Sequence, residues 1–174
     1  MTANPKDEEM VDAKLKSTGV PSEELLEKFK PPKENREQGP VVMIECFEKI
    51  PCDPCNKACK FGAVKPFDDI NDLPQVDYDK CTGCGICIGH CPGLAIFVID
   101  ENYTEDSSLV MLPYEFLPLP KEGDIVKGLD REGNYVTDAT VIKAKESNRK
   151  NSNYVVSLEV PKGDAFVVRN FETK

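Results

Sequence analysis

Several residue types are scarce or absent in this chain of 174 residues. It contains no tryptophan and a single histidine, His90, and only 7 % of its residues are aromatic. No apolar run approaches the about 20 residues that a membrane helix requires. The N-terminal residues are polar and acidic, without the basic and then apolar stretches of a secretory signal. These absences predict a hydrophilic, cytoplasmic protein that does not bind a membrane.

The motifs of the commonest enzyme classes are absent as well. The chain has no glycine-rich nucleotide fingerprint and no phosphate-binding loop. One histidine is too few for a histidine-based catalytic set, and His90 stands directly before a cysteine. We therefore expect no catalytic residues and no substrate site in this chain.

Positive charge is in deficit across the sequence. The 22 Lys and Arg residues are outnumbered by 31 Asp and Glu residues, which gives a formal net charge of −9 at pH 7. Such an acidic surface repels nucleic acid and anionic lipid, and it favours a basic docking face on a partner. We therefore expect a protein partner and no nucleic-acid partner.

Cysteine is absent outside one segment and concentrated within it. The eight cysteines are Cys46, Cys52, Cys55, Cys59, Cys81, Cys84, Cys87 and Cys91. An even number of cysteines predicts disulfides in a secreted chain, whereas thiols stay reduced in the cytoplasm. Metal binding by all eight cysteines is therefore the better interpretation.

The second cysteine run has a spacing typical of iron–sulfur ligation. Residues 81–92 read Cys-x₂-Cys-x₂-Cys-x₃-Cys-Pro. Three thiolates spaced in this way on a tight loop can reach three irons of one cluster, and Gly83 and Gly85 let the backbone fold closely around it. A zinc site instead favours cysteine pairs separated by a longer spacer. The run therefore predicts a [4Fe–4S] cluster rather than zinc.

The first cysteine run departs from this pattern at its leading position. It reads Cys46-x₅-Cys52-x₂-Cys55-x₃-Cys59, and Lys49 stands where a leading cysteine is expected. Cys46 is the candidate replacement, and residues 47–51 would have to loop out for it to reach the cluster. Two alternatives stay open: four ligands would hold a [4Fe–4S] cluster, whereas failure of Cys46 to bind would leave a three-iron cluster.

Over residues 41–100 the chain resembles the bacterial two-cluster [4Fe–4S] ferredoxins. The resemblance implies an α+β ferredoxin-like fold with two pseudo-symmetric halves, in which the last cysteine of each run binds the other cluster. On the matching positions, one cluster takes Cys46, Cys52, Cys55 and Cys91, and the other takes Cys81, Cys84, Cys87 and Cys59. His90 is then a neighbour that shields or tunes a cluster and not a ligand.

The segments outside this resemblance predict two further regions. Residues 1–40 form an N-terminal extension, a partly helical arm with one short helix over residues 21–29. Residues 41–105 form the two-cluster domain, and residues 113–174 form a small antiparallel β domain for docking, for which a barrel is one candidate form. The individual elements expected are strands at 41–44 and 95–99, extended pieces at 62–65 and 74–78, a connection over 101–112, strands at 125–129, 135–144, 154–160 and 166–168, and a turn at 130–134.

These regions together predict an electron-transfer protein. The extensions at both ends favour a relay subunit of an oxidoreductase complex. More loosely, the whole chain is similar to iron–sulfur subunits that accompany FAD-dependent amino-acid or amine dehydrogenases of anaerobes. That similarity implies a hetero-oligomer with a flavoprotein as the redox partner. The alternatives are a free-standing soluble ferredoxin and a structural metal-binding interaction module.

Overall fold

The computed structural model describes residues 12–147 and 153–173. Its internal contacts divide the chain into two units, residues 1–30 and residues 31–174, which we describe separately. Within the described segments, no helix combines the length and the apolar character that crossing a membrane requires.

The first unit contains two short helices, α1 (Ala13–Thr18) and α2 (Glu23–Phe29). The Asp12 carboxylate accepts hydrogen bonds from the first turn of α1, and the Ser22 hydroxyl caps α2 in the same way. The helix expected over residues 21–29 is therefore confirmed. The helix itself begins at Glu23, because Ser22 takes the capping position and Pro21 lies before the cap.

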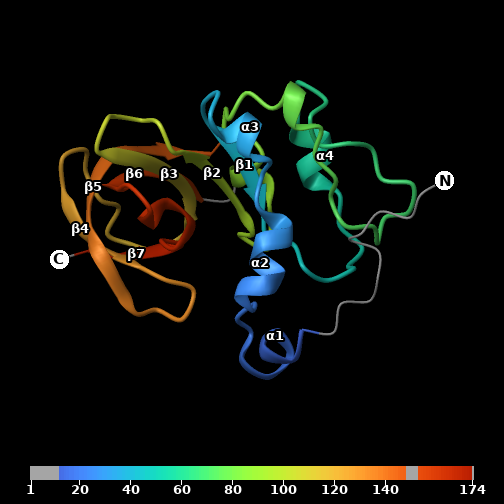
Figure 1. Cartoon of the computed structure of the whole chain (residues 1–174), viewed down its shortest axis with the longest axis horizontal. Coiled ribbons are helices and arrows are strands. Elements are labelled where there is room, and N and C mark those ends of the chain that lie inside the picture. The colour runs from blue at the N-terminus through green and yellow to red at the C-terminus, as the bar shows by residue number, and fades with distance from the viewer. Residues whose placement is uncertain (1–11, 148–152, 174) are drawn as a thin grey trace. The chain divides into compact units, whose positions relative to one another are not determined.

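The second unit contains a seven-stranded antiparallel sheet with short helices beside it (Figure 1). The strand order in the sheet is β1-β2-β3-β6-β5-β4-β7. The strands are β1 (Val41–Ile44), β2 (Ile96–Asp100), β3 (Ser107–Tyr114), β4 (Ile125–Leu129), β5 (Tyr135–Glu146), β6 (Tyr154–Pro161) and β7 (Asn170–Glu172). The helices are α3 (Lys33–Arg36), α4 (Pro54–Ala58) and the 3₁₀ turns η1 (Tyr78–Lys80), η2 (Ile88–His90) and η3 (Asp164–Phe166).

Strands β1 and β2 are apolar on both faces because both faces are covered. Their register pairs Val41 with Ile99 and Ile44 with Ile96. On one face, Val42, Ile44, Ile96 and Val98 pack in a cluster with cysteines of both runs. On the other face, the Phe97 ring lies 4.7 Å from the guanidinium carbon of Arg169. The cysteine loops and the C-terminal segment thus pack on opposite sides of the same two strands.

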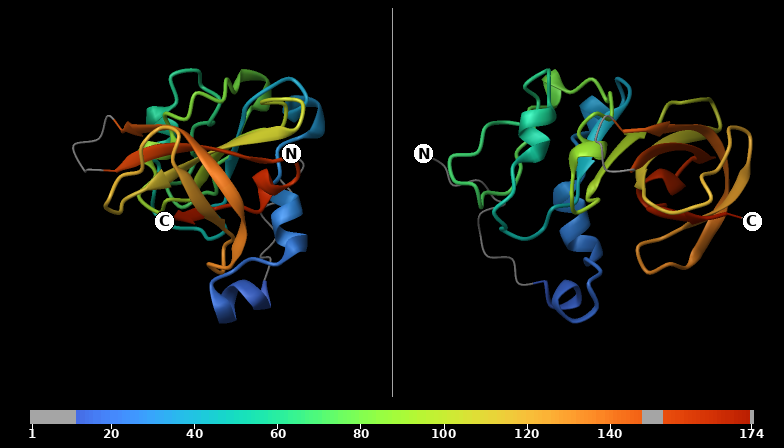
Figure 2. Two further views of the ribbon diagram at one scale, coloured as in Figure 1. Left: turned by 90° about the vertical axis from the view of Figure 1, so that its left-hand side faces the viewer. Right: turned by 180° about the vertical axis from the view of Figure 1, so that it is seen from behind.

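The C-terminal strands curl around η3 (Figure 2). The curl brings β3 near β7, the far edge of the sheet, where the Tyr114 and Phe171 rings stack with centroids 4.4 Å apart. In the described residues β7 pairs with β4 alone, so β3 and β7 meet through the stacked rings and not through a hydrogen-bonded ladder. We call this contact between β3 and β7 the seam of the curled sheet. The antiparallel β region expected from the sequence is confirmed, as a curled part of one larger sheet.

Two sequence expectations about this region are wrong. Residues 101–112 are not merely a connection, because β3 begins at Ser107 and pairs with both β2 and β6. Residues 166–168 do not form the last strand, since η3 ends at Phe166 and the strand follows as β7. The strands expected at 41–44, 125–129, 135–144 and 154–160 are present, and a Val64–Val76 bridge links the extended pieces at 62–65 and 74–78.

Candidate iron–sulfur site

The second cysteine run folds as a tight loop between η1 and β2. Cys81 follows η1, and Cys87 and Cys91 flank η2 at its two ends. Gly83 and Gly85 adopt positive φ angles of 62° and 73°, which a side chain would strain. A β-carbon on Gly83 would also collide with the backbone carbonyl of Pro40. The glycines expected to shape this loop are therefore required by its backbone.

The first cysteine run wraps around α4. The backbone N–H of Glu45 bonds the carbonyl of Ala95 at 2.7 Å, which extends the pairing of β1 with β2 to the residue before Cys46. Cys55 lies within α4, and Cys59 ends this helix. The N–H of Cys52 bonds the carbonyl of Ile70 at 3.0 Å. Backbone contacts thus fix this run at its leading end and in its middle.

One group of neighbouring thiols forms around Cys46 and Cys55. Burial raises the pKa of Cys46 to about 11, with a further contribution from the nearby thiolates of Cys91 and Cys52. The pKa of Cys55 is raised to about 12, mainly by burial and further by Cys91, Cys52 and Cys46. This group therefore takes three thiols from the first run and one from the second.

The other group is built in the same way around Cys87. Burial and the neighbouring thiolates of Cys84, Cys81 and Cys59 raise the pKa of Cys87 to about 12. Across the described residues, no three Cys, His, Asp or Glu side chains converge closely enough to hold a single metal ion. The donors in both groups are thiols, the ligand type that iron–sulfur clusters use. Binding to metal would release the protons that burial retains on Cys46, Cys55 and Cys87.

The two halves share a local hydrogen-bond pattern. The N–H of Val64 points to Cys59 Sγ at 3.5 Å, and the N–H of Ala95 points to Cys91 Sγ at 3.4 Å. Both contacts join the last cysteine of a run to the residue that leads into the following extended segment. Such N–H groups stabilise negative charge on sulfur. The two cysteine runs thus end in equivalent local structures.

The cysteines differ in their exposure to solvent. Cys55 and Cys87 are buried, Cys84 is exposed, and the other five are intermediate. His90 lies at the end of η2, and its Nδ1 is 2.9 Å from the carbonyl oxygen of Ile86. One group of thiols therefore reaches the surface at Cys84.

A buried ion cluster stands directly before Cys46. The Glu45 carboxylate bonds Arg131 Nε at 2.9 Å and Arg169 Nε at 2.6 Å. The Glu45 and Arg169 side chains are 7 % and 4 % exposed. Arg169 also donates to the carbonyls of Ala165 and Val168, so its charge is well satisfied. The C-terminal segment thus holds the residue that precedes the leading cysteine.

Burial and charge act against each other in this cluster. Burial raises the pKa of Glu45, but hydrogen bonds and charges from Arg131 and Arg169 outweigh it and lower the pKa below its ordinary value. Burial lowers the pKa of Arg169 to about 10, against the opposing effect of Glu45. Glu45 therefore stays ionised at neutral pH, with Arg131 and Arg169 beside it.

Sequence reasoning missed this cluster. Glu45 carries a weak signal, since it is a charged residue at the end of an apolar strand and next to a cysteine. Its partners are 86 and 124 residues away in the sequence, and no local pattern connects them.

The comparisons with known proteins agree with the chemistry of the second run. Residues 74–97 match the family of 4Fe-4S binding domains. This segment contains Cys81, Cys84, Cys87 and Cys91. The chain therefore carries a 4Fe–4S binding domain of the ferredoxin type.

Curated relatives cover further parts of the chain. The chain is 38 % identical over 91 residues to a subunit of the selenate reductase of Mesobacillus selenatarsenatis. It is 36 % identical over 70 residues to a subunit of the Na(+)-translocating ferredoxin:NAD(+) oxidoreductase complex of Acetobacterium woodii. It is also 38 % identical over 53 residues to the PorD subunit of the pyruvate synthase of Methanocaldococcus jannaschii. By their names, all three relatives are subunits of larger enzymes.

These matches are partial on both sides. They cover 49 %, 33 % and 30 % of this chain, and 28 %, 21 % and 59 % of the respective relatives. No solved structure matches the chain.

Proposed function

We propose that this chain is an electron-transfer subunit that holds two [4Fe–4S] clusters and relays single electrons within an oxidoreductase complex. The observation that supports the proposal most directly is the match of residues 74–97 to the 4Fe-4S binding domains, beside which each cysteine run has one thiol near those of the other run. Cys46, Cys52, Cys55 and Cys91 would hold one cluster, and Cys81, Cys84, Cys87 and Cys59 would hold the other. When bound, each cluster supplies reversible one-electron chemistry.

The polypeptide contributes the environment of these clusters. The apolar cluster of β1 and β2 lies against both groups of thiols and lowers the local dielectric, which disfavours added negative charge. The N–H groups of Val64 and Ala95 act in the opposite direction, because they stabilise charge on sulfur. The balance of these effects sets the reduction potentials.

The relatives support a role as a subunit. Their names describe subunits of a selenate reductase, of a sodium-translocating oxidoreductase complex and of a pyruvate synthase, and these enzymes differ widely. We therefore propose a hetero-oligomer with a redox partner, with catalysis carried out by that partner. A flavoprotein partner and a cytoplasmic location are further proposals, which rest on the sequence.

Anaerobic reconstitution of the full chain tests the proposal. We expect about eight irons per chain, a broad absorbance near ~400 nm that dithionite bleaches, and paramagnetic reduced centres. Cys46→Ala and Cys84→Ala, one from each group, should each alter the spectrum of a different centre. A colourless protein that retains zinc, or a single centre that both variants change identically, would contradict the proposal.

A further inference from the structure

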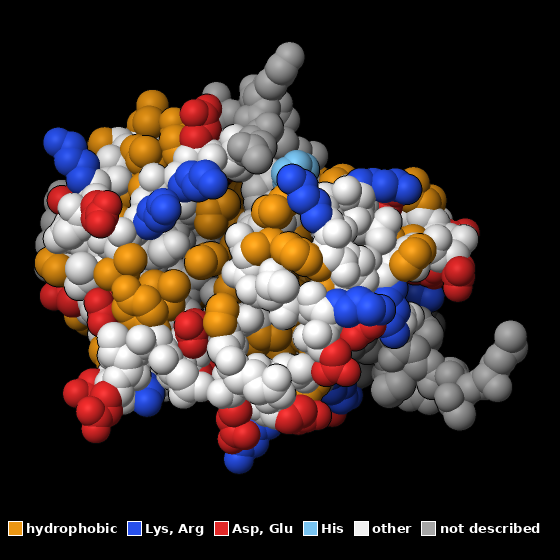
Figure 3. Space-filling model, turned by 90° about the horizontal axis from the view of Figure 1, so that it is seen from above, with side chains coloured by type: hydrophobic (Ala, Val, Ile, Leu, Met, Phe, Trp, Pro, Cys, Tyr) orange, Lys and Arg blue, Asp and Glu red, His pale blue; other side chains and the backbone are white. Residues whose placement is uncertain are grey.

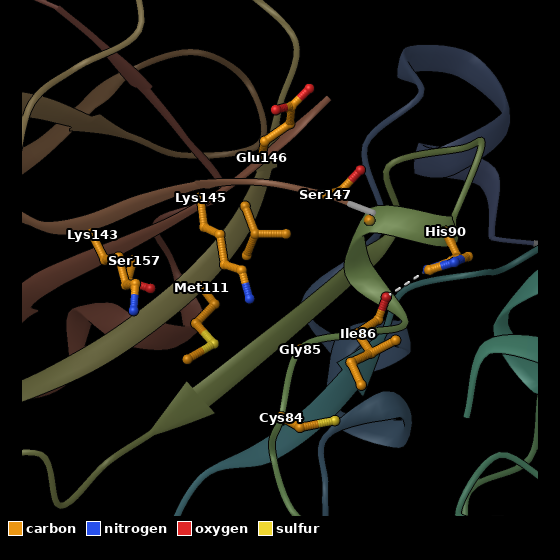
Figure 4. A pocket seen from close by; sticks show the side chains of 12 residues that line it. Cys84, Gly85, Ile86, His90, Met111, Lys143, Lys145, Glu146, Ser147 and Ser157 are labelled. Atoms are coloured by element: carbon orange, nitrogen blue, oxygen red, sulfur yellow. Dashed lines mark hydrogen bonds between the residues drawn. The ribbon is translucent and has the colours of Figure 1, made fainter. Parts of the chain in front are cut away.

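A cavity of about 230 Å³ lies beside the exposed cysteine. One wall is the second cysteine loop, with Cys84, Ile86 and His90, and the opposite wall is formed by β3, β5 and β6 (Figure 4). Cys84 is the one exposed cysteine among the eight. A group of thiols proposed to hold a cluster therefore meets solvent at the edge of this cavity.

The walls of the cavity are held in place by buried polar contacts. The side-chain amide of Asn153, which is 2 % exposed, donates to the carbonyl of Gly89 at 3.2 Å. The Ser147 hydroxyl bonds the Asn153 side chain in turn. A β-carbon on Gly89 would collide with Ser147, so the two walls touch at this end. The cavity is thus preformed by the fold.

The cavity carries positive charge in an acidic chain. Lys143 and Lys145 on β5 are two residues apart and share one face of the strand. In Figure 4 Lys145 points from β5 into the space between Met111 and Ile86, whereas the Glu146 carboxylate points away. Among the described residues, neither lysine forms an ion pair within the chain. On the face in Figure 3, the single histidine lies at the surface next to a basic side chain.

The size of the cavity limits what can occupy it. Pockets that enclose cofactors or drug-sized ligands usually measure about 300–1,000 Å³. A space of about 230 Å³ that is lined by two lysines fits one or two protruding side chains better than a nucleotide. The charge complement of these two lysines is a carboxylate.

We propose that this cavity is the face through which electrons would leave the cluster held by the second group of thiols, and that it seats an acidic projection of the redox partner protein. The inference rests on the proposed function, since it requires a reducible cluster behind Cys84. The net charge of −9 would repel an acidic partner elsewhere, so the two lysines would also select the docking orientation.

Charge reversal in the reconstituted full chain tests the electron-exit face. The chain is first reduced with dithionite and then oxidised by Co(III)–EDTA, an anionic outer-sphere acceptor. One electron leaves the reduced chain and converts Co(III) to Co(II), with no proton or bond transferred. Lys143→Glu/Lys145→Glu should slow this oxidation about tenfold at low ionic strength and should accelerate oxidation by cationic hexaamminecobalt(III).

Lys121→Glu/Lys162→Glu is the matched control, because it reverses two exposed lysines outside the cavity and changes the net charge equally. It should change either rate less than the cavity variant does, because the interaction of a charge with the acceptor weakens with distance from the exit face. Equal effects of the two double variants on these oxidation rates would show that the cavity is not the exit face. A chain without any reducible centre would instead refute the proposed function itself.

A competition experiment tests the occupant. A hexaglutamate peptide should slow the oxidation of the wild-type chain by Co(III)–EDTA, and it should leave the Lys143→Glu/Lys145→Glu rate unchanged. Inorganic phosphate at the same ionic strength should have no effect beyond screening. If phosphate inhibits as strongly as the peptide, the cavity binds a small anion and not an acidic protein segment. If neither the peptide nor phosphate inhibits, the cavity is not a docking site.

Discussion

The two cysteine loops reach similar groups of thiols by different means. The second loop is compact, and its shape comes from glycines within the run, such as Gly83 with a φ of 62°. The first loop is interrupted, and its leading cysteine follows Glu45, which is held by Arg131 and Arg169 from the C-terminal segment. One loop is therefore specified by local sequence, and the other depends on residues that are far away in the chain.

Removing one ligand from each loop is the strongest way to test this contrast. We expect Cys87→Ala to lose about half of the iron, because Cys87 lies in the middle of the compact loop and is buried. Cys46→Ala should keep a three-iron centre in the first group, since its three remaining thiols do not depend on the inserted residues. Iron analysis and electron paramagnetic resonance measure both outcomes. Equal iron loss in the two variants would contradict the contrast.

Breaking the buried ion cluster should have the next largest effect. Glu45→Ala leaves two arginine charges without their carboxylate, and loss of one partner from a buried ion pair costs about 3–5 kcal/mol. Anaerobic guanidinium unfolding followed by circular dichroism measures the change. Glu172→Ala removes the partner of Lys127 in an exposed pair, and it should cost at most ~1 kcal/mol. A comparably small loss for Glu45→Ala would show that the cluster does not anchor the first loop.

The glycines of the second loop provide a smaller test. Gly83→Ala should destabilise the chain by about 1–3 kcal/mol, because alanine is strained at positive φ and its β-carbon meets Pro40. Gly93→Ala is the control, since a β-carbon there has no neighbour within 4 Å. It should change the free energy of unfolding by less than about 0.5 kcal/mol. If both variants unfold alike, the loop does not depend on the glycine.

The smallest effect is expected far from both loops, at the seam of the curled sheet. Phe171→Leu removes the ring that stacks on Tyr114, and such aromatic pairs contribute about 0.5–1.5 kcal/mol beyond their buried area. The spectra of the reconstituted centres should not change. Tyr135→Leu, at a residue that is 59 % exposed, serves as the control for stability. A spectral change in Phe171→Leu would show that the seam and the cysteine loops are coupled.

The sequence predicted those elements whose signal is local. The turn at 130–134 was expected from its polar residues, and the carbonyl of Asn134 accepts the N–H of Asp130 at 2.9 Å while Gly133 has a φ of 85°. Strands β4 and β5 lie on either side of it as expected. The spacing of the second cysteine run likewise predicted the family match over residues 74–97.

The features that were missed depend on tertiary contacts. Strand β3 begins with serines and contains Pro113, so its polar start resembles a connection until β2 and β6 flank it. The short apolar run at 166–168 has strand-like composition, but Val167 and Val168 both donate to the carbonyl of Asp164 in a tight turn. The Glu45 cluster and the cavity beside Cys84 each join segments that only the folded sheet brings together.

The uninterrupted sheet also determines how this chain can be divided. Strand β2 leaves the cysteine loops, and β3 continues the same ladder, with Val98 opposite Met111 and Asp100 opposite Leu109. A fragment cut near residue 105 would expose the whole outer edge of β2, and such an unpaired strand edge promotes aggregation. The same cut would strip Phe97 of the guanidinium that covers its ring. Gene fusions and minimal versions of this protein should therefore keep the C-terminal strands attached to the iron–sulfur segment.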